Sequence, residues 1–374
     1  MEQQKLTASD GRGGDTFGFE VSISGDTAIV GAYEDYGQGS AYVFVRSGTT
    51  WTEQQKLTAS DGAAGDSFGL PVSISGDTAI VGAHRNDDNG SSSGSAYVFV
   101  RSGTTWTEQQ KLTPSDGAAG DNFGHSASIS GDTAIIGAMA DDDNGSASGS
   151  AYVFVRSGTT WTEQQKLTAS DGAAVDYFGI TVSISGDIAI VGAHKSDTPG
   201  FDSGSAYVFV RSGTTWTEQQ KLTPSDGAAG DIFGNSVSIS GDTAIIGAYG
   251  DDDNGSDSGS AYVFVRSGTT WTEQQKLTAS DGAASDWFGF SVSISGDTAI
   301  VGAYEDDSGE GSAYVFVRSG TTWTEQQKLT ASDGAASDSF GRSVSISGDT
   351  AIIGAFGDDD DGSNSGSAYV FALP

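Results

Sequence analysis

Residues 123–168 read FGHSASISGDTAIIGAMADDDNGSASGSAYVFVRSGTTWTEQQKLT, and this segment decides the fold. It contains four strand-like stretches, at residues 123–130, 133–138, 149–157 and 159–168. Ser-Gly-Asp-Thr between the first two stretches and Arg-Ser-Gly-Thr-Thr between the last two are tight-turn signals. The segment therefore predicts a four-stranded antiparallel meander.

Near-identical copies of this segment fill the chain. The pentapeptide EQQKL occurs seven times, beginning at Glu2, Glu53, Glu108, Glu163, Glu218, Glu273 and Glu325. The third strand of each copy is apolar on both faces, since in the first copy Ala41 and Val43 alternate with Tyr42 and Phe44. A sheet with two apolar faces must be covered on both sides, which face-to-face stacking of repeated blades provides. The sequence predicts an all-β, seven-bladed β-propeller of four-stranded antiparallel blades.

The copies do not begin and end at blade boundaries. The last copy ends at AYVFALP and lacks the fourth strand, which residues 2–6 supply at the other end of the chain. We expect a single propeller over residues 1–374, closed by pairing of the N-terminal strand into the last blade. The expected blades cover residues 17–58, 68–113, 123–168, 178–223, 233–278, 288–330 and 340–372, each to within a few residues.

Composition restricts the possible partners. The chain has 50 acidic and 17 basic residues and a net charge of −33, which repels nucleic acids and anionic lipid surfaces. We therefore expect no nucleic-acid partner. No apolar run is long enough to span a bilayer, so we expect no membrane insertion. We also expect a monomer. No basic and apolar leader precedes Glu2, so no signal peptide is expected within these residues.

Most acidic residues fall in two kinds of connection that a propeller places on one face: the loops between blades and the loops between the second and third strands. The longest of these loops combine carboxylate oxygens with glycine, which favours Ca²⁺ as a ligand. The spacing is imperfect, because Ala140 stands where a calcium loop needs its first Asp. The alternative is that these are solvated turns. The candidate metal ligands are Asp141, Asp142, Asp143, Asn144, Asp251, Asp252, Asp253, Asn254, Asp358, Asp359 and Asp360.

The few positions that differ between copies lie beside the same loops, before and after Phe-Gly and after Gly-Ala. Aromatic, His and Arg side chains at such positions are typical of a recognition surface, although permissive packing would also allow variation there. The candidate ligand-binding face consists of Tyr33, His84, His125, Tyr177, His194, Tyr249, Trp287, Tyr304, Arg342 and Phe356. The Trp of TTWTEQQKL, present in six copies, either packs between blades at the rim or stacks on sugars.

Each copy resembles the FG-GAP repeat, which occurs in integrin α-chain propellers and in many bacterial surface proteins. In the first copy Phe17-Gly18 and Gly31-Ala32 carry the resemblance, and Phe340-Gly341 and Gly354-Ala355 carry it in the last. The repeats are most similar to the bacterial variety. The resemblance implies a non-enzymatic adhesion or interaction module, usually extracellular. Integrin-type repeats place a calcium loop between the first two strands, where this chain has only Ser-Gly-Asp-Thr, so calcium binding does not carry over by position.

We therefore expect an extracellular or cell-surface interaction module, not an enzyme, with an acidic face able to bind calcium and a protein or glycan ligand. No nucleophile motif, phosphate loop or HExxH spacing accompanies the three histidines. One alternative is a lectin-like carbohydrate binder that uses the aromatic positions. Another is an idealised or recently amplified repeat protein with no evolved ligand, because near-identical copies arise by duplication without selection for seven working sites.

Overall fold

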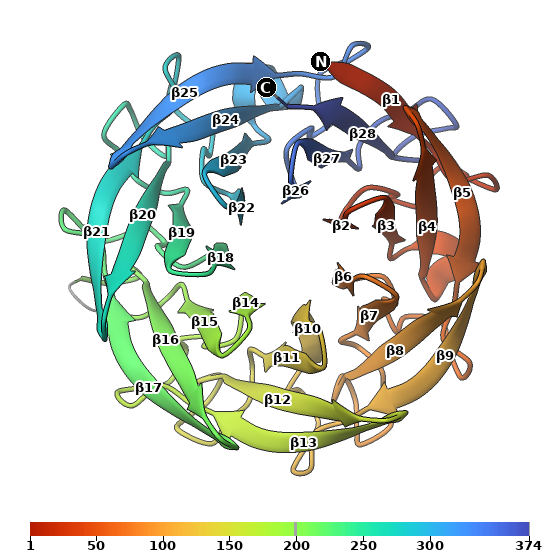
Figure 1. The fold of residues 1–374 in the computed structure, drawn as a ribbon, viewed down its shortest axis with the longest axis horizontal. Helices are drawn as coiled ribbons and strands as arrows, with labels where there is room; N and C mark the ends of the chain where they lie inside the picture. Colours follow the sequence, from red (N-terminus) through yellow and green to blue (C-terminus); the bar gives the residue numbers. More distant parts are fainter. Residues whose placement is uncertain (198–199, 374) are drawn as a thin grey trace.

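The computed structural model describes residues 1–197 and 200–373, which form seven four-stranded antiparallel sheets around a central axis (Figure 1). This confirms the predicted all-β, seven-bladed propeller. In six blades the strands follow chain order from the centre outwards, as in β2-β3-β4-β5 of the first blade, and in the seventh β1 lies outside β26, β27 and β28. Among the described residues, no helix has the length and apolar character needed to cross a membrane.

The strands have the following bounds. The first three blades contain β2 (Val21–Ser24), β3 (Thr27–Ala32), β4 (Ser40–Ser47), β5 (Thr50–Leu57); β6 (Val72–Ser75), β7 (Thr78–Ala83), β8 (Ser95–Ser102), β9 (Thr105–Leu112); β10 (Phe123–Ser130), β11 (Thr133–Ala138), β12 (Ser150–Ser157) and β13 (Thr160–Leu167). The next two contain β14 (Val182–Ser185), β15 (Ile188–Ala193), β16 (Ser205–Ser212), β17 (Thr215–Leu222); β18 (Val237–Ser240), β19 (Thr243–Ala248), β20 (Ser260–Ser267) and β21 (Thr270–Leu277). The last two contain β22 (Ser291–Ser295), β23 (Thr298–Ala303), β24 (Ser312–Ser319), β25 (Thr322–Leu329); β26 (Val344–Ser347), β27 (Thr350–Ala355), β28 (Ser367–Ala372) and β1 (Glu2–Leu6). Short turns of helix occur at η1 (Asp35–Gly37) and α1 (Asp306–Gly309).

The two ends of the chain meet in the seventh blade, as predicted. Strand β1 pairs antiparallel with β28, with Lys5 opposite Tyr369 and Leu6 opposite Ala368. The N-terminal ammonium donates a hydrogen bond of 2.7 Å to the carbonyl of Ala372. The ring is therefore closed by hydrogen bonding within one sheet, which leaves β28 without an open edge.

The core consists of layers between adjacent blades, because alternate side chains of each strand face opposite neighbours. Ile29 and Val43 of the first blade belong to a buried cluster with Val81 of the second. Val30 and Phe44, from the same two strands, belong to the cluster shared with the seventh blade. The apolar alternation in the sequence thus supplies both faces of every sheet.

Phe-Gly and Gly-Ala mark the positions where adjacent blades touch backbone to backbone. A Cβ on Gly31 would lie 2.1 Å from the carbonyl oxygen of Gly69 in the next blade. The buried ring of Phe17 packs edge-on against Tyr42, with centroids 5.5 Å apart, and the arrangement recurs in every blade. Glycine is needed at these positions because no side chain fits between the two backbones.

At the rim, the repeated tryptophans are structural. The side-chain amide of Gln55 donates to the carbonyl of Trp106 and accepts from its N–H, both at 2.8 Å. The same pairing joins Gln4 to Trp51 and recurs at six of the seven junctions. Each tryptophan side chain is only about 2% exposed, so the hypothesis that these rings stack on sugars is wrong.

Deletion of residues 1–6 should lower the free energy of unfolding by at least about 3 kcal/mol, because loss of the buried Leu6 side chain alone costs about 2–5 kcal/mol. Urea unfolding of the shortened and full chains measures the difference. A synthetic peptide of residues 1–8, added to the shortened chain, should restore part of the lost stability. Unchanged stability after the deletion would contradict closure by β1.

Candidate binding face and channel mouth

Ion pairs show that the two kinds of acidic loop lie side by side. Lys276, near the end of β21, contacts Asp226 in the loop between the fourth and fifth blades and Asp251 in the loop between β19 and β20. The Asp of the Ser-Gly-Asp turns pairs elsewhere: Asp26 binds Arg46 at the opposite end of the strands. We call the side that carries the inter-blade loops and the loops between second and third strands the acidic-loop face.

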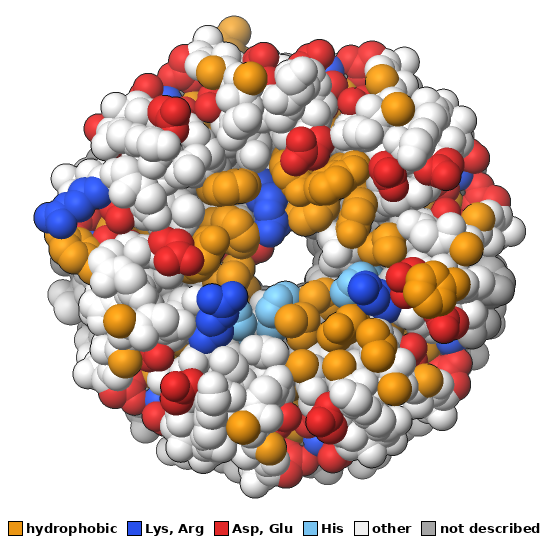
Figure 2. Space-filling model, turned by 180° about the vertical axis from the view of Figure 1, so that it is seen from behind, with side chains coloured by type: hydrophobic (Ala, Val, Ile, Leu, Met, Phe, Trp, Pro, Cys, Tyr) orange, Lys and Arg blue, Asp and Glu red, His pale blue; other side chains and the backbone are white. Residues whose placement is uncertain are grey.

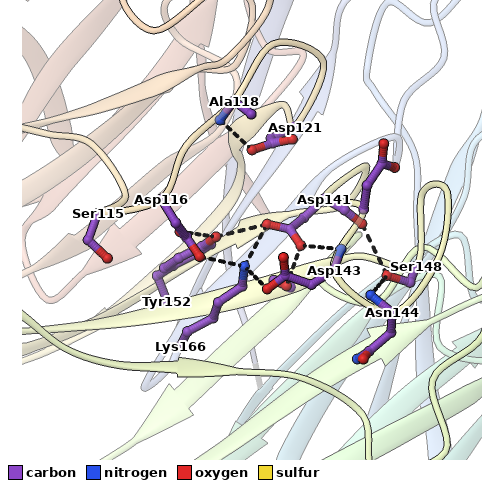
Figure 3. A network of polar contacts seen from close by, with 12 residues as sticks. Ser115, Asp116, Ala118, Asp121, Asp141, Asp143, Asn144, Ser148, Tyr152 and Lys166 are labelled. Carbon is purple, nitrogen blue, oxygen red and sulfur yellow. Dashed lines mark hydrogen bonds and ion pairs between the residues drawn. The ribbon is translucent and has the colours of Figure 1, made fainter.

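A lysine stands at the centre of each acidic cluster, as Figure 3 shows for the third blade. The Nζ of Lys166 lies 2.8 Å from Asp116, 2.9 Å from Asp141 and 2.5 Å from Asp143. The hydroxyl of Tyr152 lies within 2.9 Å of both Asp116 and Asp141. Asp141 is buried, and Lys166 and Tyr152 satisfy its carboxylate. The cluster therefore contains its own cation.

The same arrangement changes the pKa values of its members. Burial opposes ionisation of Asp226, but hydrogen bonds from Lys276 and Tyr262 outweigh burial and hold the pKa of this carboxyl below its usual value. Burial also disfavours the charge of Lys276, yet its hydrogen bonds to Asp226, Asp251 and Asp253 raise the pKa of the ammonium. Both groups are therefore charged at neutral pH, and each is neutralised by the other.

The predicted metal ligands divide into four roles. Asp141, Asp251 and Asp358 are buried against lysine and tyrosine, and Asp143, Asp253 and Asp360 are the exposed partners of the same lysines. Asp142, Asp252 and Asp359 accept backbone hydrogen bonds within their own loops. Asn144 and Asn254 donate their backbone N–H groups to Ser148 and Ser258.

In the described part of the chain, two acidic triads have carboxylate oxygens close enough to share a metal ion: Asp226, Asp251, Asp253 and Asp333, Asp358, Asp360. Their oxygen ligands suit calcium. However, Lys276 occupies the first triad and Lys5 the second, each within 2.8 Å of all three carboxylates. A metal ion can enter only if the ammonium leaves. The sequence did not reveal that a lysine would compete with a metal ion for these carboxylates. The available signal was the strand register: in the third blade Lys166 lies opposite Tyr152, and both stand at the acidic-loop end of their strands.

The central channel opens on the acidic-loop face as a cavity of about 740 Å³. Apolar and histidine side chains surround the opening, and acidic side chains lie farther out (Figure 2). We call this opening the channel mouth; its lining includes Tyr33, His84, His125 and Arg342 from the predicted ligand-binding face, with Phe19 and Phe290. Tyr249, Trp287, Tyr304 and Phe356 join it through ring contacts. The remaining two predicted residues, Tyr177 and His194, stack on each other.

The aromatic side chains form two clusters that Arg342 connects. Phe19 packs against Tyr33 and Phe356, with centroids 4.6 and 5.1 Å apart. Phe290 packs against Tyr304 at 4.6 Å. Phe19 and Phe290 were not among the predicted ligand-binding residues, although both occupy the variable position after Phe-Gly, which was the available signal.

Three neutral imidazoles lie across the channel. His84 and His125 meet edge to face with centroids 5.4 Å apart, and His194 stacks on Tyr177. Burial is the main cause that lowers the pKa of His84 to about 3 and the pKa values of His125 and His194 to about 4. Within the described residues, the Nδ1 atom of each is buried without a hydrogen-bond partner. His84 and His125 therefore line the channel as uncharged rings whose Nδ1 atoms are buried.

Comparisons with known proteins agree with this geometry. A family model described as FG-GAP repeat matches residues 1–44, 51–99, 106–154, 161–209, 216–264, 271–316 and 323–371. No curated protein matches the chain. A solved structure of Saccharomyces cerevisiae Sqt1 matches over 100% of both chains with a TM-score of 0.53 at 11% sequence identity, which supports the fold alone.

Replacing the three histidines with glutamine should flatten the dependence of stability on pH between about 6.5 and 4. In the unfolded chain each imidazole binds a proton near pH 6.5, whereas the folded pKa values are lower, so the free energy of unfolding falls as the pH drops through this window. Because the channel admits water, we expect roughly 1–3 kcal/mol per imidazole at pH 4. Urea unfolding from pH 7 to 4 measures this.

A Met139→Leu variant is the matched control, because Met139 lines the same cavity but does not titrate. The acidic residues are common to all three proteins, so the difference between their pH profiles isolates the histidines. Equal slopes for the triple variant and the unaltered protein would contradict burial of neutral imidazoles.

Proposed function

The chain belongs to the FG-GAP repeat family, and on that premise we propose that it is a non-enzymatic interaction module that holds a protein partner on its acidic-loop face. One observation carries the proposal. The copies are nearly identical, yet the side chains that differ between them gather at the channel mouth. Differences that converge from seven blades on one opening are typical of a surface that recognises something asymmetric.

The chemistry of this face indicates the kind of partner. Large aromatic side chains give contact area at low entropic cost, which suits the centre of an interface. Around them, exposed carboxylates such as Asp88 and Asp143, each about half exposed, produce a negative field. A partner that presents basic residues around an apolar centre would be steered to this face and held there.

An extracellular or cell-surface location and a role in adhesion are part of the proposal. They rest on the resemblance to repeats of surface proteins. Carbohydrate binding is the alternative, and after exclusion of the rim tryptophans it depends on the aromatic side chains of the channel mouth alone. A repeat protein without an evolved ligand is the other alternative, which the peptide selection described below also tests.

Calcium binding is a further part of the proposal, with a condition that the lysines impose. The oxygen triads suit calcium, but the ion must displace Lys276 or Lys5, which already form ion pairs with these carboxylates. Binding of calcium by the unaltered protein should therefore be weak and should compete with the internal ammonium groups. Removing a lysine should create a stronger site.

We expect calcium to raise the melting temperature of a Lys276→Met variant more than that of the unaltered protein. At a free concentration about five times Kd, one new site contributes about 1 kcal/mol. Melting curves in chelator, in calcium and in magnesium measure the effect, and Arg266→Met, on the opposite face, is the control. An equal calcium response in both proteins would contradict the competition.

Selection from a random peptide library on the immobilised protein tests the interaction module. Enriched peptides should contain Lys or Arg together with apolar residues, and their affinity should fall at least tenfold in a Tyr249→Ala, Tyr304→Ala variant, which removes two rings of the channel mouth. Binding is measured by calorimetry. The matched control is Asp77→Ser, Asp132→Ser on the opposite face, which should leave binding unchanged.

Selection without any consensus, or equal loss in both variants, would contradict the proposal and favour a protein with no evolved ligand. A glycan array provides the second comparison. Saturable sugar binding that the Tyr249→Ala, Tyr304→Ala variant loses, without peptide binding, would favour the carbohydrate alternative.

A further inference from the structure

Arg342 differs from most cations of this protein because it has no carboxylate partner. Within the described residues, thirteen of the 17 lysines and arginines form ion pairs, and the exceptions are Arg12, Arg85, Lys195 and Arg342. The first three lie in the acidic loops. Arg342 lines the central cavity, as Arg85 also does, but it follows Phe-Gly at a position where the other blades carry uncharged side chains.

Aromatic rings from the two neighbouring blades hold the guanidinium of Arg342. Its central carbon lies 4.2 Å from the centroid of Phe19 in the first blade and 4.6 Å from that of Phe290 in the sixth. Tyr304 contributes a third ring at 5.7 Å. Rings that pack against the faces of a guanidinium leave its N–H groups, which lie in the plane, as the means of contact with a ligand.

No acceptor in the described part of the chain satisfies these side-chain N–H groups by a hydrogen bond, nor does a carboxylate lie within ion-pair distance. Glu20 is the carboxylate whose charge acts on Arg342, but it accepts a hydrogen bond from the Ser343 hydroxyl at 3.3 Å and none from the guanidinium. Burial lowers the pKa of Arg342 and raises that of Glu20, so the two charges compensate each other only in part. A planar fork of donors in a partly dehydrated site matches a carboxylate, which accepts two parallel N–H bonds.

The surroundings add an apolar requirement. The cavity of about 740 Å³ is large enough for a small organic molecule, and its wall near Arg342 is aromatic. The opposite wall carries the uncharged rings of His84 and His125, whose Nδ1 atoms have no partner within the described residues. A ligand that filled this space would place one charged end on Arg342 and an apolar body against the rings.

We propose that the channel mouth binds an organic carboxylate with an aromatic or other apolar body, and that Arg342 holds the carboxylate through its N–H edge. This site goes beyond the proposed protein partner and does not depend on it, because the acidic loops take no part in the contact. The acidic-loop face even opposes it, since its long-range field repels an anion. The rings and the fork of Arg342 therefore select for a ligand that offers both groups together.

The opposing field gives the site a recognisable salt dependence. At an ionic strength of about 0.01 M the Debye length is about 30 Å, so the acidic loops act on the whole channel mouth, whereas at 0.15 M it is about 8 Å. The contact between Arg342 and a carboxylate is partly buried and is screened less. The affinity for the carboxylate should therefore increase as salt is added in this range, opposite to the weakening expected for a basic peptide on the acidic loops.

Calorimetric titration with 3-phenylpropionate tests the proposal, with 3-phenylpropionamide and acetate as matched ligands that lack the charge or the ring. We expect 3-phenylpropionate to bind at least tenfold more tightly than either. Arg342→Gln should abolish the difference between acid and amide, and Arg342→Lys should weaken binding of the acid because it keeps the charge but loses the fork. Arg85→Gln, which removes the other unpaired cation of the cavity lining, should keep the preference for the acid, and Arg12→Gln, in an acidic loop outside the lining, is the control.

Binding of the acid no tighter than the amide would overturn the proposal, as would equal affinities in Arg342→Gln and the unaltered protein. Loss of the preference for the acid in Arg85→Gln or Arg12→Gln, or weaker binding at 0.15 M than at 0.01 M salt, would overturn the placement at Arg342. Melting curves of each variant show whether it folds. If Arg342→Gln does not fold, Arg342→Lys decides whether Arg342 holds the carboxylate. Peptide binding to the same proteins separates this result from the fate of the proposed interaction module.

Discussion

Burial of every sheet on both faces is the constraint on which this structure depends. A four-stranded sheet such as β2-β3-β4-β5 offers Val30 and Phe44 to one neighbour and Ile29 and Val43 to the other, so no blade can bury its surface alone. Only a closed ring gives each blade two neighbours, and β1 provides the missing strand. Because the contact surface is the same at each junction, near-identical copies are sufficient, and only the strand ends at the two faces are free to differ.

The acidic clusters show how a chain with a charge of −33 remains compact. Each cluster surrounds one lysine, and the buried carboxylate, as at Asp141, has a tyrosine as well as the ammonium for a partner. Two blades replace this carboxylate with Asn86 and Ser196, which keep a contact to Lys111 and Lys221. A buried carboxylate without its lysine would lower the stability of the fold, so the main role of the cluster is structural. Metal binding at the same oxygens is in competition with that element.

The sequence determines the fold prediction because its signals are local: turn residues, alternation and repetition all act within about 50 residues. The closing strand follows from the same logic, since the last copy lacks its fourth strand. The candidate site is harder to predict from the sequence. Asp116 and Lys166 are 50 residues apart, and nothing in their own segments shows that the loop reaches the strand end. The guanidinium of Arg342 meets Phe19 only across the ring closure, so its aromatic environment could be found only once the ring was known. The variable positions still indicated side chains that lie close together, because neighbouring blades bring equivalent positions together.

Backbone conformation explains why the side chains at the channel mouth have fixed positions. The residue before Phe-Gly has a positive φ in all seven blades, between 55° and 60°, even where it is Ile232 or Thr16. A β-branched residue adopts this conformation only under constraint from its surroundings. The constraint is visible: the N–H of Ile232 donates to the carbonyl of Asp202 in the loop of the preceding blade, at 3.2 Å. Hydrogen bonds between neighbouring loops thus fix the starting point of each inner strand, and with it the side chain that follows Phe-Gly. A ligand at the channel mouth would then meet side chains whose backbone is already ordered, and the entropic cost of binding would fall mainly on the ligand.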